Sequence, residues 1–146
     1  METPHRFCTF SLGGYLFGVT LIQVQEVLRP QPMTKVPLAS ETIAGLINLR
    51  GQIVTAIDLR KLLLLGERPE DKPAMNIILR NEDGLVSLLV DEIGDVLEMP
   101  YGECERPPET LQGRVRECID GVYKLPNRLL LVLNSAQVTG SHAVAA

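Results

Sequence analysis

Glycine and proline residues divide this chain into short aliphatic runs, and this punctuation limits what the chain can fold into. Twelve glycines and ten prolines occur among 146 residues, and the apolar runs between them have the length of strands rather than of helices. Short strands with glycine turns favour small closed β-barrels, because closure removes the edges that an open five-stranded sheet would expose. The chain is therefore expected to be mainly β, with short helices.

Four hairpins and one further extended segment account for the expected strands. Their turns fall at Gly13-Gly14, Gly51-Gln52, residues 81–84 and Pro126-Asn127, where glycine, asparagine or proline favours a tight turn. The expected strands cover residues 7–12, 15–20, 76–80, 85–90, 93–99, 119–125 and 128–133, together with the hairpin over residues 45–59.

Helices are expected to be short and few. Residues 21–28 combine helical spacing with a β-like end, which predicts a short helical turn that runs into a strand. A second helix is expected over residues 59–64, with Asp58 as its N-cap. Residues 101–116 are expected to form a loop, and residues 135–146 a frayed tail.

The stretch "GLINLRGQIVTAIDLR", residues 45–60, carries polar residues inside an aliphatic hairpin. Glycine at the first central position suits a type II′ turn at Gly51-Gln52, which would pair Arg50 with Ile53. One face of that hairpin is wholly apolar, with Ile47, Leu49, Val54 and Ala56. The other face mixes apolar and polar side chains, namely Leu46, Asn48, Arg50, Ile53, Thr55 and Ile57. Such a mixed face suits a surface that binds a partner.

Two parts of the chain echo each other in sequence. The segment "VQEVL" at residues 24–28 aligns with "IGDVL" at residues 93–97, at an offset of 69 residues. The later hairpins align at an offset of 76 residues, so that Gly45, Leu49, Ile53, Ile57 and Asp58 fall on Gly121, Leu125, Leu129, Leu133 and Asn134. Two similar five-stranded units explain this echo, and chance similarity among aliphatic strands is the alternative.

The expected organisation is a single domain over residues 1–146 that consists of two five-stranded halves. The halves are expected to be residues 15–66, with the first strand crossing over, and residues 74–134. The charged, proline-bearing run at residues 66–73 is expected to link them.

Composition excludes several classes of function. The net charge is −4 and only 4% of the residues are aromatic, whereas nucleic-acid binding needs excess positive charge and stacking aromatics. No segment approaches the roughly 18 apolar residues of a membrane span, so no direct membrane insertion is expected. Three widely spaced cysteines indicate a reducing compartment rather than a disulfide framework, which predicts a cytoplasmic protein.

Sequence patterns for catalysis or metal binding are missing. His5 and His142 lie near the ends, and no two cysteines have the spacing of a metal site. Neither histidine is placed to activate a nucleophile, and the acidic pairs at residues 82–83 and 91–92 fit solvated turns better than an acid/base pair. No glycine-rich phosphate-binding loop precedes a long helix. We therefore expect no enzyme, no metal and no cofactor.

Glu26 and Arg50 are opposite charges, each flanked by aliphatic residues. Charged residues among apolar neighbours often set specificity in protein interfaces, so both residues are candidates for recognition. The alternative is a solvated glutamate and an arginine that only ends a hairpin. The spacing of the residues alone leaves both interpretations open.

The chain resembles the CheW-like family of bacterial chemotaxis coupling proteins in a series of blocks. In order, these are "VQEVL" at residues 24–28, a proline-marked link, "GLINLRGQIVTAIDLR" at 45–60, "VDEIGDVLEM" at 90–99 and "IDGVYKLPNRLLLVLN" at 119–134. The resemblance implies two SH3-like five-stranded β-barrels around a shared hydrophobic core. It also implies a non-catalytic adaptor that binds the cytoplasmic tip of chemoreceptors and the regulatory domain of the CheA histidine kinase, in a membrane-associated array.

The same resemblance implies which residues contact the partners. The glutamate of the first block and the arginine of the "NLRG" core are implicated in receptor and kinase contacts in the family, and they correspond to Glu26 and Arg50. The candidate protein interface is therefore Val24, Glu26, Val27, Asn48 and Arg50. The chain departs from the family after Asn134, where a segment of weak helical content replaces a leucine-rich helix.

Two alternatives to this adaptor stay open. A barrel that senses a small ligand would need a closed apolar pocket with a few convergent polar groups. An adaptor of a non-flagellar chemosensory pathway, such as twitching motility, would have a similar sequence.

Overall fold

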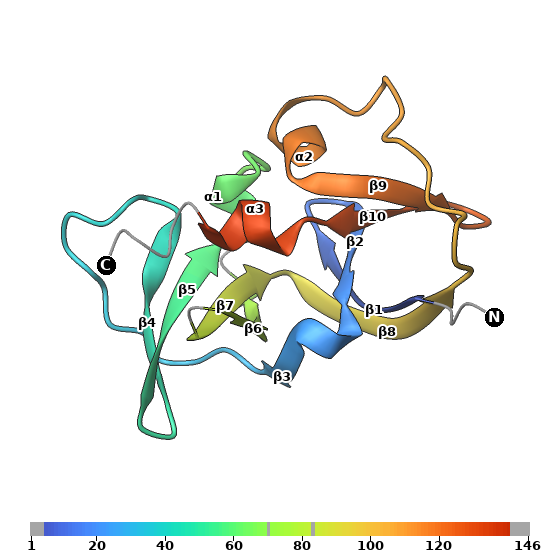
Figure 1. Cartoon of the computed structure of the whole chain (residues 1–146). Helices are drawn as coiled ribbons and strands as arrows, with labels where there is room; N and C mark the ends of the chain where they lie inside the picture. The colour runs from blue at the N-terminus through green and yellow to red at the C-terminus, as the bar shows by residue number, and fades with distance from the viewer. Residues whose placement is uncertain (1–4, 70, 83, 141–146) are drawn as a thin grey trace.

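The computed structural model describes residues 5–69, 71–82 and 84–140, which form two five-stranded sheets (Figure 1). The strands are β1 (His5–Leu12), β2 (Tyr15–Thr20), β3 (Val24–Leu28), β4 (Ile43–Leu49), β5 (Gln52–Asp58), β6 (Met75–Asn81), β7 (Gly84–Val90), β8 (Glu92–Met99), β9 (Ile119–Lys124) and β10 (Leu129–Leu133). We call the sheet β8-β1-β2-β10-β9 barrel I and the sheet β3-β6-β7-β5-β4 barrel II. Both have the SH3-like barrel fold, so the expected fold class is confirmed.

Each barrel combines strands from the two expected halves of the chain. Barrel I combines β1 and β2 with β8, β9 and β10, whereas barrel II combines β3, β4 and β5 with β6 and β7. The chain crosses from one barrel to the other after β2 and again after β7. The barrels therefore do not coincide with the expected halves, residues 15–66 and 74–134, because the two parts of the chain exchange strands.

The echo in the sequence corresponds to equivalent strands of the two barrels. Leu12 faces Tyr15 across β1 and β2, and Asn81 faces Gly84 across β6 and β7, 69 residues further along. A parallel pair also recurs in each barrel, β2 with β10 and β7 with β5. Agreement in register and in strand direction favours a structural repeat over chance similarity among aliphatic strands.

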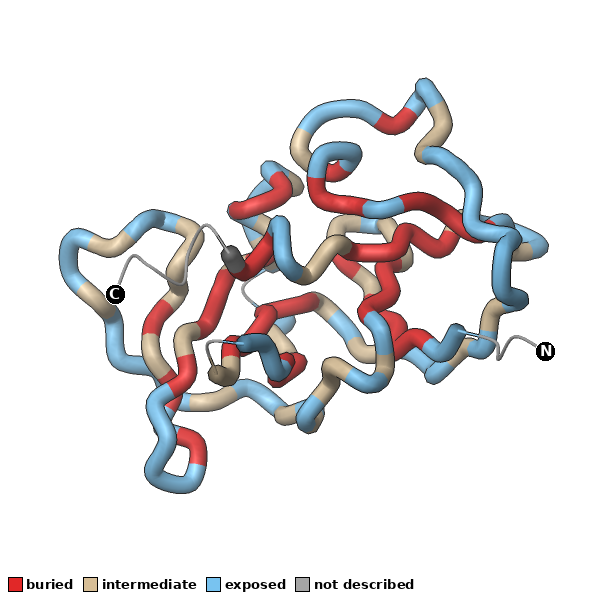
Figure 2. The backbone as a smooth tube through the Cα atoms, viewed as in Figure 1, coloured by how far each residue is buried: buried red, intermediate tan, exposed pale blue. Residues whose placement is uncertain are grey.

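In the described part of the chain, the buried side chains form three groups, and Figure 2 shows that most buried residues lie in the strands. The largest group joins the two barrels and includes Phe10, Phe17, Ile57, Ile77 and Leu88. The interior of barrel I contains Phe7, Tyr123, Leu130 and Val132, and that of barrel II contains Ile47, Leu49, Val54, Ala56, Ile78 and Leu89. Burial of each large apolar side chain contributes about 1.5–3 kcal/mol to stability. The expected shared hydrophobic core is present.

The helices that the structure describes are short, namely η1 (Leu21–Gln23), α1 (Leu59–Leu62), α2 (Gly113–Glu117) and α3 (Ser135–Gly140). The helical turn before β3 and the capped helix after β5 are confirmed. Asp58 accepts a hydrogen bond from the backbone N–H of Lys61 at 3.2 Å, which satisfies one of the free N–H groups at the start of α1.

Two expectations about irregular segments are wrong. The loop expected over residues 101–116 contains the start of α2, and the frayed tail expected from Ser135 onward contains α3. Val138 of α3 is fully buried in the shared core, and this packing holds a helix that propensity alone does not predict. Residues 141–146 of the expected tail lie outside the described residues.

The turn between β4 and β5 differs from its predicted register by one residue. Leu49 faces Gln52, so Arg50 and Gly51 form the turn, with φ angles of 51° and 87°. Two positive φ angles are typical of a type I′ turn, not of the expected type II′ turn. The side-chain oxygen of Asn48 accepts a hydrogen bond from the backbone N–H of Gly51 at 2.9 Å. Moving the turn by one residue shifts each cross-strand partner by two residues, an even number, so the strand residues keep their expected faces, whereas Arg50 lies in the turn rather than on the mixed face.

Gly45 lies where the connector before β4 approaches that strand most closely. Thr34 and Leu46 exchange two backbone hydrogen bonds of 2.9 and 2.8 Å beside it, and a Cβ atom at Gly45 would lie 2.8 Å from the carbonyl oxygen of Thr34. The equivalent Gly121 of β9 meets the carbonyl oxygen of Glu105 in the same way, at 2.6 Å. The aligned glycines of the echo therefore both make room for a passing backbone.

Replacement of Gly45 by alanine is expected to destabilise the fold. The added methyl group must displace the backbone of Thr34, and overpacking of this kind costs about 1–3 kcal/mol. Urea unfolding of Gly45→Ala and of the wild type measures the difference. An unchanged midpoint would contradict the close approach of the connector.

An ion pair between Arg60 and Asp91 fixes the junction of the two barrels. Asp91 lies at the crossover from β7 to β8, and Arg60 of α1 donates two hydrogen bonds to its carboxylate, at 2.8 and 2.6 Å. The backbone N–H of Gly13, in the β1–β2 turn, donates a third at 3.0 Å. The side chains of Arg60 and Asp91 are only 13% and 19% exposed.

The electrostatic balance at Asp91 favours its charged form. Burial acts to raise the pKa of Asp91, but the hydrogen bonds from Arg60 and Gly13 and the positive charges of Arg60 and Arg68 outweigh it. The pKa of Asp91 therefore lies below its ordinary value of 3.8. The junction depends on a carboxylate that stays ionised at neutral pH.

Candidate partner-docking site

Glu26 and Arg50 lie far apart in the sheet order of barrel II but meet in space. Glu26 belongs to β3 at one edge of the sheet, and Arg50 is in the turn beyond β4 at the other edge. Arg50 Nη2 donates a hydrogen bond to Glu26 Oε2 in an ion pair. The fold thus brings together the two charged residues that the sequence singled out.

This ion pair lies at the surface of the molecule. The side chain of Arg50 is 66% exposed and that of Glu26 is 25% exposed. The hydrogen bond and the charge of Glu26 raise the pKa of Arg50 further above its already high value, so the guanidinium is permanently charged. Exposed ion pairs contribute little to stability, which leaves both side chains able to take part in recognition.

Exposed aliphatic side chains lie on the same strand and hairpin as the two charged residues. Val27 is 38% exposed and Ile53 of β5 is 61% exposed, and Ile53 faces Asn48 across the hairpin. Val24 is half-buried and packs against the shared core, so part of its role is structural. The mixed polar and apolar face of the β4–β5 hairpin is narrower than the sequence predicted, because Ile57 is fully buried.

The residues of the candidate interface thus have different surroundings. Asn48 is exposed, and its side-chain oxygen holds the backbone of the Arg50-Gly51 turn. We call Val24, Glu26, Val27, Asn48, Arg50 and Ile53 together the docking surface. Figure 1 shows the β4–β5 hairpin extending from the body of the molecule, and Figure 2 shows its tip as exposed.

Sequence reasoning missed two further residues near this surface. Ile22 of η1 is largely exposed although it is a large aliphatic residue. Arg80 of β6 donates hydrogen bonds to the side chain of Gln25 and to the backbone of Ile22. Ile22 falls outside the helical spacing of Leu21, Val24 and Leu28, and this was the available signal for its exposure. Nothing in the sequence indicated the contacts of Arg80.

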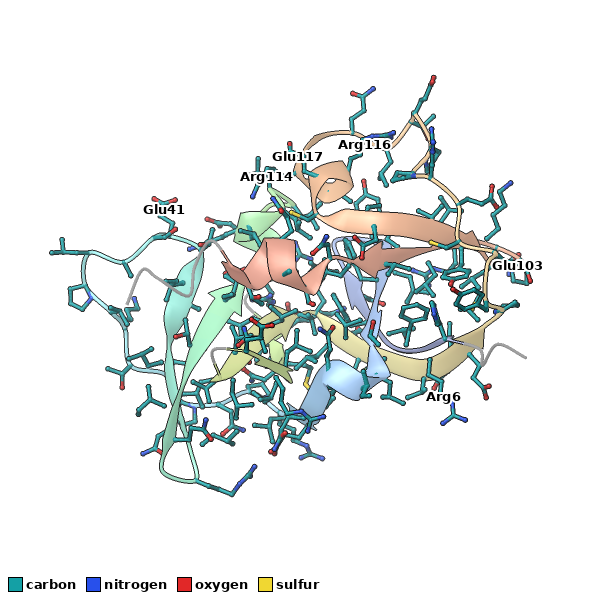
Figure 3. All side chains as sticks on the ribbon, in the orientation of Figure 1. Arg6, Glu41, Glu103, Arg114, Arg116 and Glu117 are labelled. Atoms are coloured by element: carbon teal, nitrogen blue, oxygen red, sulfur yellow. The ribbon has the colours of Figure 1, made fainter. Side chains whose placement is uncertain are left out.

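A second group of charged side chains, Arg114, Arg116 and Glu117, lies on α2 (Figure 3) and makes contacts within the protein. Arg114 donates a hydrogen bond to Glu117, three residues along the helix, at 3.1 Å. Arg116 donates to the backbone carbonyls of Pro108 and Leu111 at 2.6 and 3.0 Å. The contacts of Arg116 hold the segment before α2 against the helix. Both arginines therefore have partners within the protein itself.

Two hollows on the described part of the surface have charged residues in their walls. One, of about 420 Å³, is lined by Asp71, Lys72, Pro73, Met75, Asp91, Glu92 and Ile93. A smaller one, of about 200 Å³, is lined by Ser11, Arg60, Arg68, Pro69, Lys72, Asp91 and Glu92. Neither has the closed apolar lining that a sensor of small ligands requires.

Within the described ranges 5–69, 71–82 and 84–140, no three histidine, cysteine or acidic residues gather as a metal centre would require. Burial raises the pKa of the Cys8 and Cys118 thiols, which keeps them protonated and weakly nucleophilic at neutral pH.

The helices in the described part of the chain are too short or too polar to cross a membrane.

Known proteins resemble this chain over nearly its whole length. The profile of the CheW-like domain matches residues 6–142. The chemotaxis protein CheW of Bacillus subtilis is 33% identical over 138 residues, which cover 94% of this chain and 88% of that protein. The protein PilI of Pseudomonas aeruginosa is 25% identical over 78% of this chain and 64% of its own length.

A solved structure agrees with the sequence comparisons. The crystal structure of the scaffolding protein TtCheW from Thermoanaerobacter tengcongensis superposes with a TM-score of 0.80 at 29% sequence identity. The superposition covers 91% of this chain and 86% of that protein. With the profile match and the two barrels around one shared core, these similarities establish that the chain belongs to the CheW-like domain family.

Proposed function

We propose that this chain is a non-catalytic adaptor that couples chemoreceptors to a CheA-type histidine kinase in bacterial chemosensory signalling. In this proposal it binds the cytoplasmic tip of a receptor and the regulatory domain of the kinase. It would act in the cytoplasm, recruited to membrane-associated receptor arrays. The docking surface would supply the contacts.

The observation that carries this proposal is the Glu26–Arg50 ion pair at the surface, on a strand and a hairpin that also expose the aliphatic side chains Val27 and Ile53. Apolar contacts supply binding energy at an interface, and charged groups at its centre set which partner fits. The ion pair lies on a strand and a tight turn rather than on a long loop, so its geometry is largely formed before a partner arrives. The relatives named as chemotaxis and scaffolding proteins support the same role.

Calorimetric titration tests this proposal. The purified chain is titrated with the kinase regulatory domain, and separately with the cytoplasmic fragment of a chemoreceptor, both from the same genome. We expect saturable binding to each partner. The proposal fails if every kinase regulatory domain and every receptor fragment of that genome leaves the chain unbound.

A second candidate function is that of an adaptor in a non-flagellar chemosensory pathway. The similarity to the protein PilI of Pseudomonas aeruginosa supports it. The same titration distinguishes the two pathways when the kinases and receptors of each are tested separately. Tighter binding to the non-flagellar kinase would favour the second candidate.

A further inference from the structure

A β-bulge in β3 determines which way Glu26 points. Val24 faces Leu79 of β6, whereas Glu26 faces Ile78, so Gln25 is an extra residue without an opposite partner. In an unbroken register Glu26 would face Ile77 instead. Bulges insert one residue and re-aim the side chains that follow it.

The change of register moves the Glu26 side chain from the face of β3 that looks toward the shared core to the opposite face. Ile77 and Leu79 are buried in the shared core between the barrels, whereas Ile78 is buried in the interior of barrel II. Successive residues of a strand point to opposite faces. Without the bulge, Glu26 would point toward the shared core, where an unpaired carboxylate is costly. With it, Glu26 points to the side on which Arg50 lies.

Arg80 of β6 holds this bulge from the neighbouring strand. Its Nη1 donates to Oε1 of Gln25 at 2.8 Å, and its Nη2 donates to the backbone carbonyl of Ile22 at 2.7 Å. One guanidinium thus joins the extra residue to the helical turn that leads into β3. The planar fork of arginine suits two such acceptors, which a lysine cannot bind with the same geometry.

Barrel I has a bulge at the equivalent place but holds it differently. The register of β1 with β8 shifts between Cys8 and Phe10, and the hydroxyl of Thr9 donates to the backbone carbonyl of Asp95. In barrel II the residue equivalent to Thr9 is Ile78, which has no group to donate. Barrel II therefore needs another donor at its bulge, and Arg80 provides it.

We infer that Arg80 is a positioning residue of the docking surface, because it fixes the bulge that turns Glu26 toward Arg50. Arg80 acts through Gln25 and Ile22, and this role is separate from any contact that it makes with a partner. The consequence for partner binding rests on the proposed function, whereas the effect on the bulge is a property of the free protein.

Hydrogen exchange in the free protein tests the structural half of this inference. In Arg80→Met, the backbone amides of residues 24–28 are expected to exchange on the order of tenfold faster, because local opening becomes easier. The amides around Asp95 in the bulge of barrel I serve as an internal control and should keep their rates. Equal exchange of residues 24–28 in Arg80→Met and wild type would overturn the inference.

A double-mutant cycle tests the functional half. Binding to the kinase regulatory domain or receptor fragment is measured for Arg80→Met, Glu26→Gln and the double variant, with Arg6→Met of barrel I as the control for a lost charge. We expect Arg80→Met to weaken binding on the order of tenfold and the double variant to bind no more weakly than Glu26→Gln. Arg80→Lys should recover only part of the loss.

The outcomes separate the possible roles of Arg80. Losses that multiply in the double variant would show that Arg80 contacts the partner independently of Glu26, and would overturn the positioning role. A large fall in the unfolding temperature of Arg80→Met would do the same by showing a general structural role. If the wild type binds no partner, the proposed function fails, while the exchange measurement still decides whether Arg80 holds the bulge.

Discussion

Arg50→Glu is expected to weaken binding to the kinase regulatory domain or to the receptor fragment roughly hundredfold, because charge reversal at an interface anchor removes an attraction and adds a repulsion. The unfolding temperature should stay close to that of the wild type, since the side chain is 66% exposed and exposed ion pairs contribute little to stability. Surface plasmon resonance and thermal unfolding on the same preparation measure both quantities.

Arg128→Glu is the matched control for this substitution. Arg128 is an exposed arginine beside the turn of the β9–β10 hairpin, which is the counterpart in barrel I of the hairpin that carries Arg50. The same change of charge at Arg128 should leave binding to that partner unaffected. If Arg50→Glu unfolds as it loses binding, Arg50 is a structural residue and the docking surface is wrongly placed.

Asp91→Asn is expected to destabilise the protein by about 2–3 kcal/mol, because it leaves the largely buried guanidinium of Arg60 without a counter-charge. For a chain of this size, that loss lowers the unfolding temperature by roughly 5–10 °C. Asparagine keeps the volume of the side chain and can still accept a hydrogen bond from Gly13. The loss of stability therefore measures the effect of removing the charge rather than an effect on packing.

The effect of Asp91→Asn should depend on pH in a defined direction. The pKa of Asp91 is lowered in the folded protein, so its stabilising contribution is complete above its ordinary value of 3.8 and is lost as the pH falls through the lower folded value. The difference in stability between wild type and variant should be constant from neutral pH to about pH 5 and shrink below about pH 4. Asp95→Asn, at an exposed position of β8, is the control.

Local sequence patterns predicted most of the strands because each depended on nearby residues. The glycine pair at residues 13–14 forms a turn with positive φ angles at both positions, as the sequence indicated. Alternation of apolar residues gave the two faces of the β4–β5 hairpin correctly although its turn was misplaced by one residue. The faces stayed correct because moving the turn by one residue shifts the cross-strand partners by two, which matches the period of side-chain alternation.

Features that depend on distant contacts could not be predicted in the same way. Val138 stabilises α3 by packing into a core that includes Cys8 of β1, about 130 residues earlier in the chain. The exchange of strands between the barrels depends on how the crossovers after β2 and β7 run, and no local pattern determines that. The resemblance to a family identified Glu26 and Arg50 as candidates, but their direct ion pair follows from the closure of barrel II and from a bulge at Gln25 that sequence alternation conceals.

Co-sedimentation with receptor-bearing membranes tests the central claim most directly. The kinase regulatory domain is mixed with these membranes in the presence of the wild-type chain, of Arg50→Glu, or of neither. The coupling role predicts that the kinase domain sediments with the membranes when the wild-type chain is present, and that Arg50→Glu reduces its recovery to the level seen without the chain. Equal recovery in all three mixtures would contradict the coupling role, and equal recovery with the wild type and Arg50→Glu would contradict the docking surface.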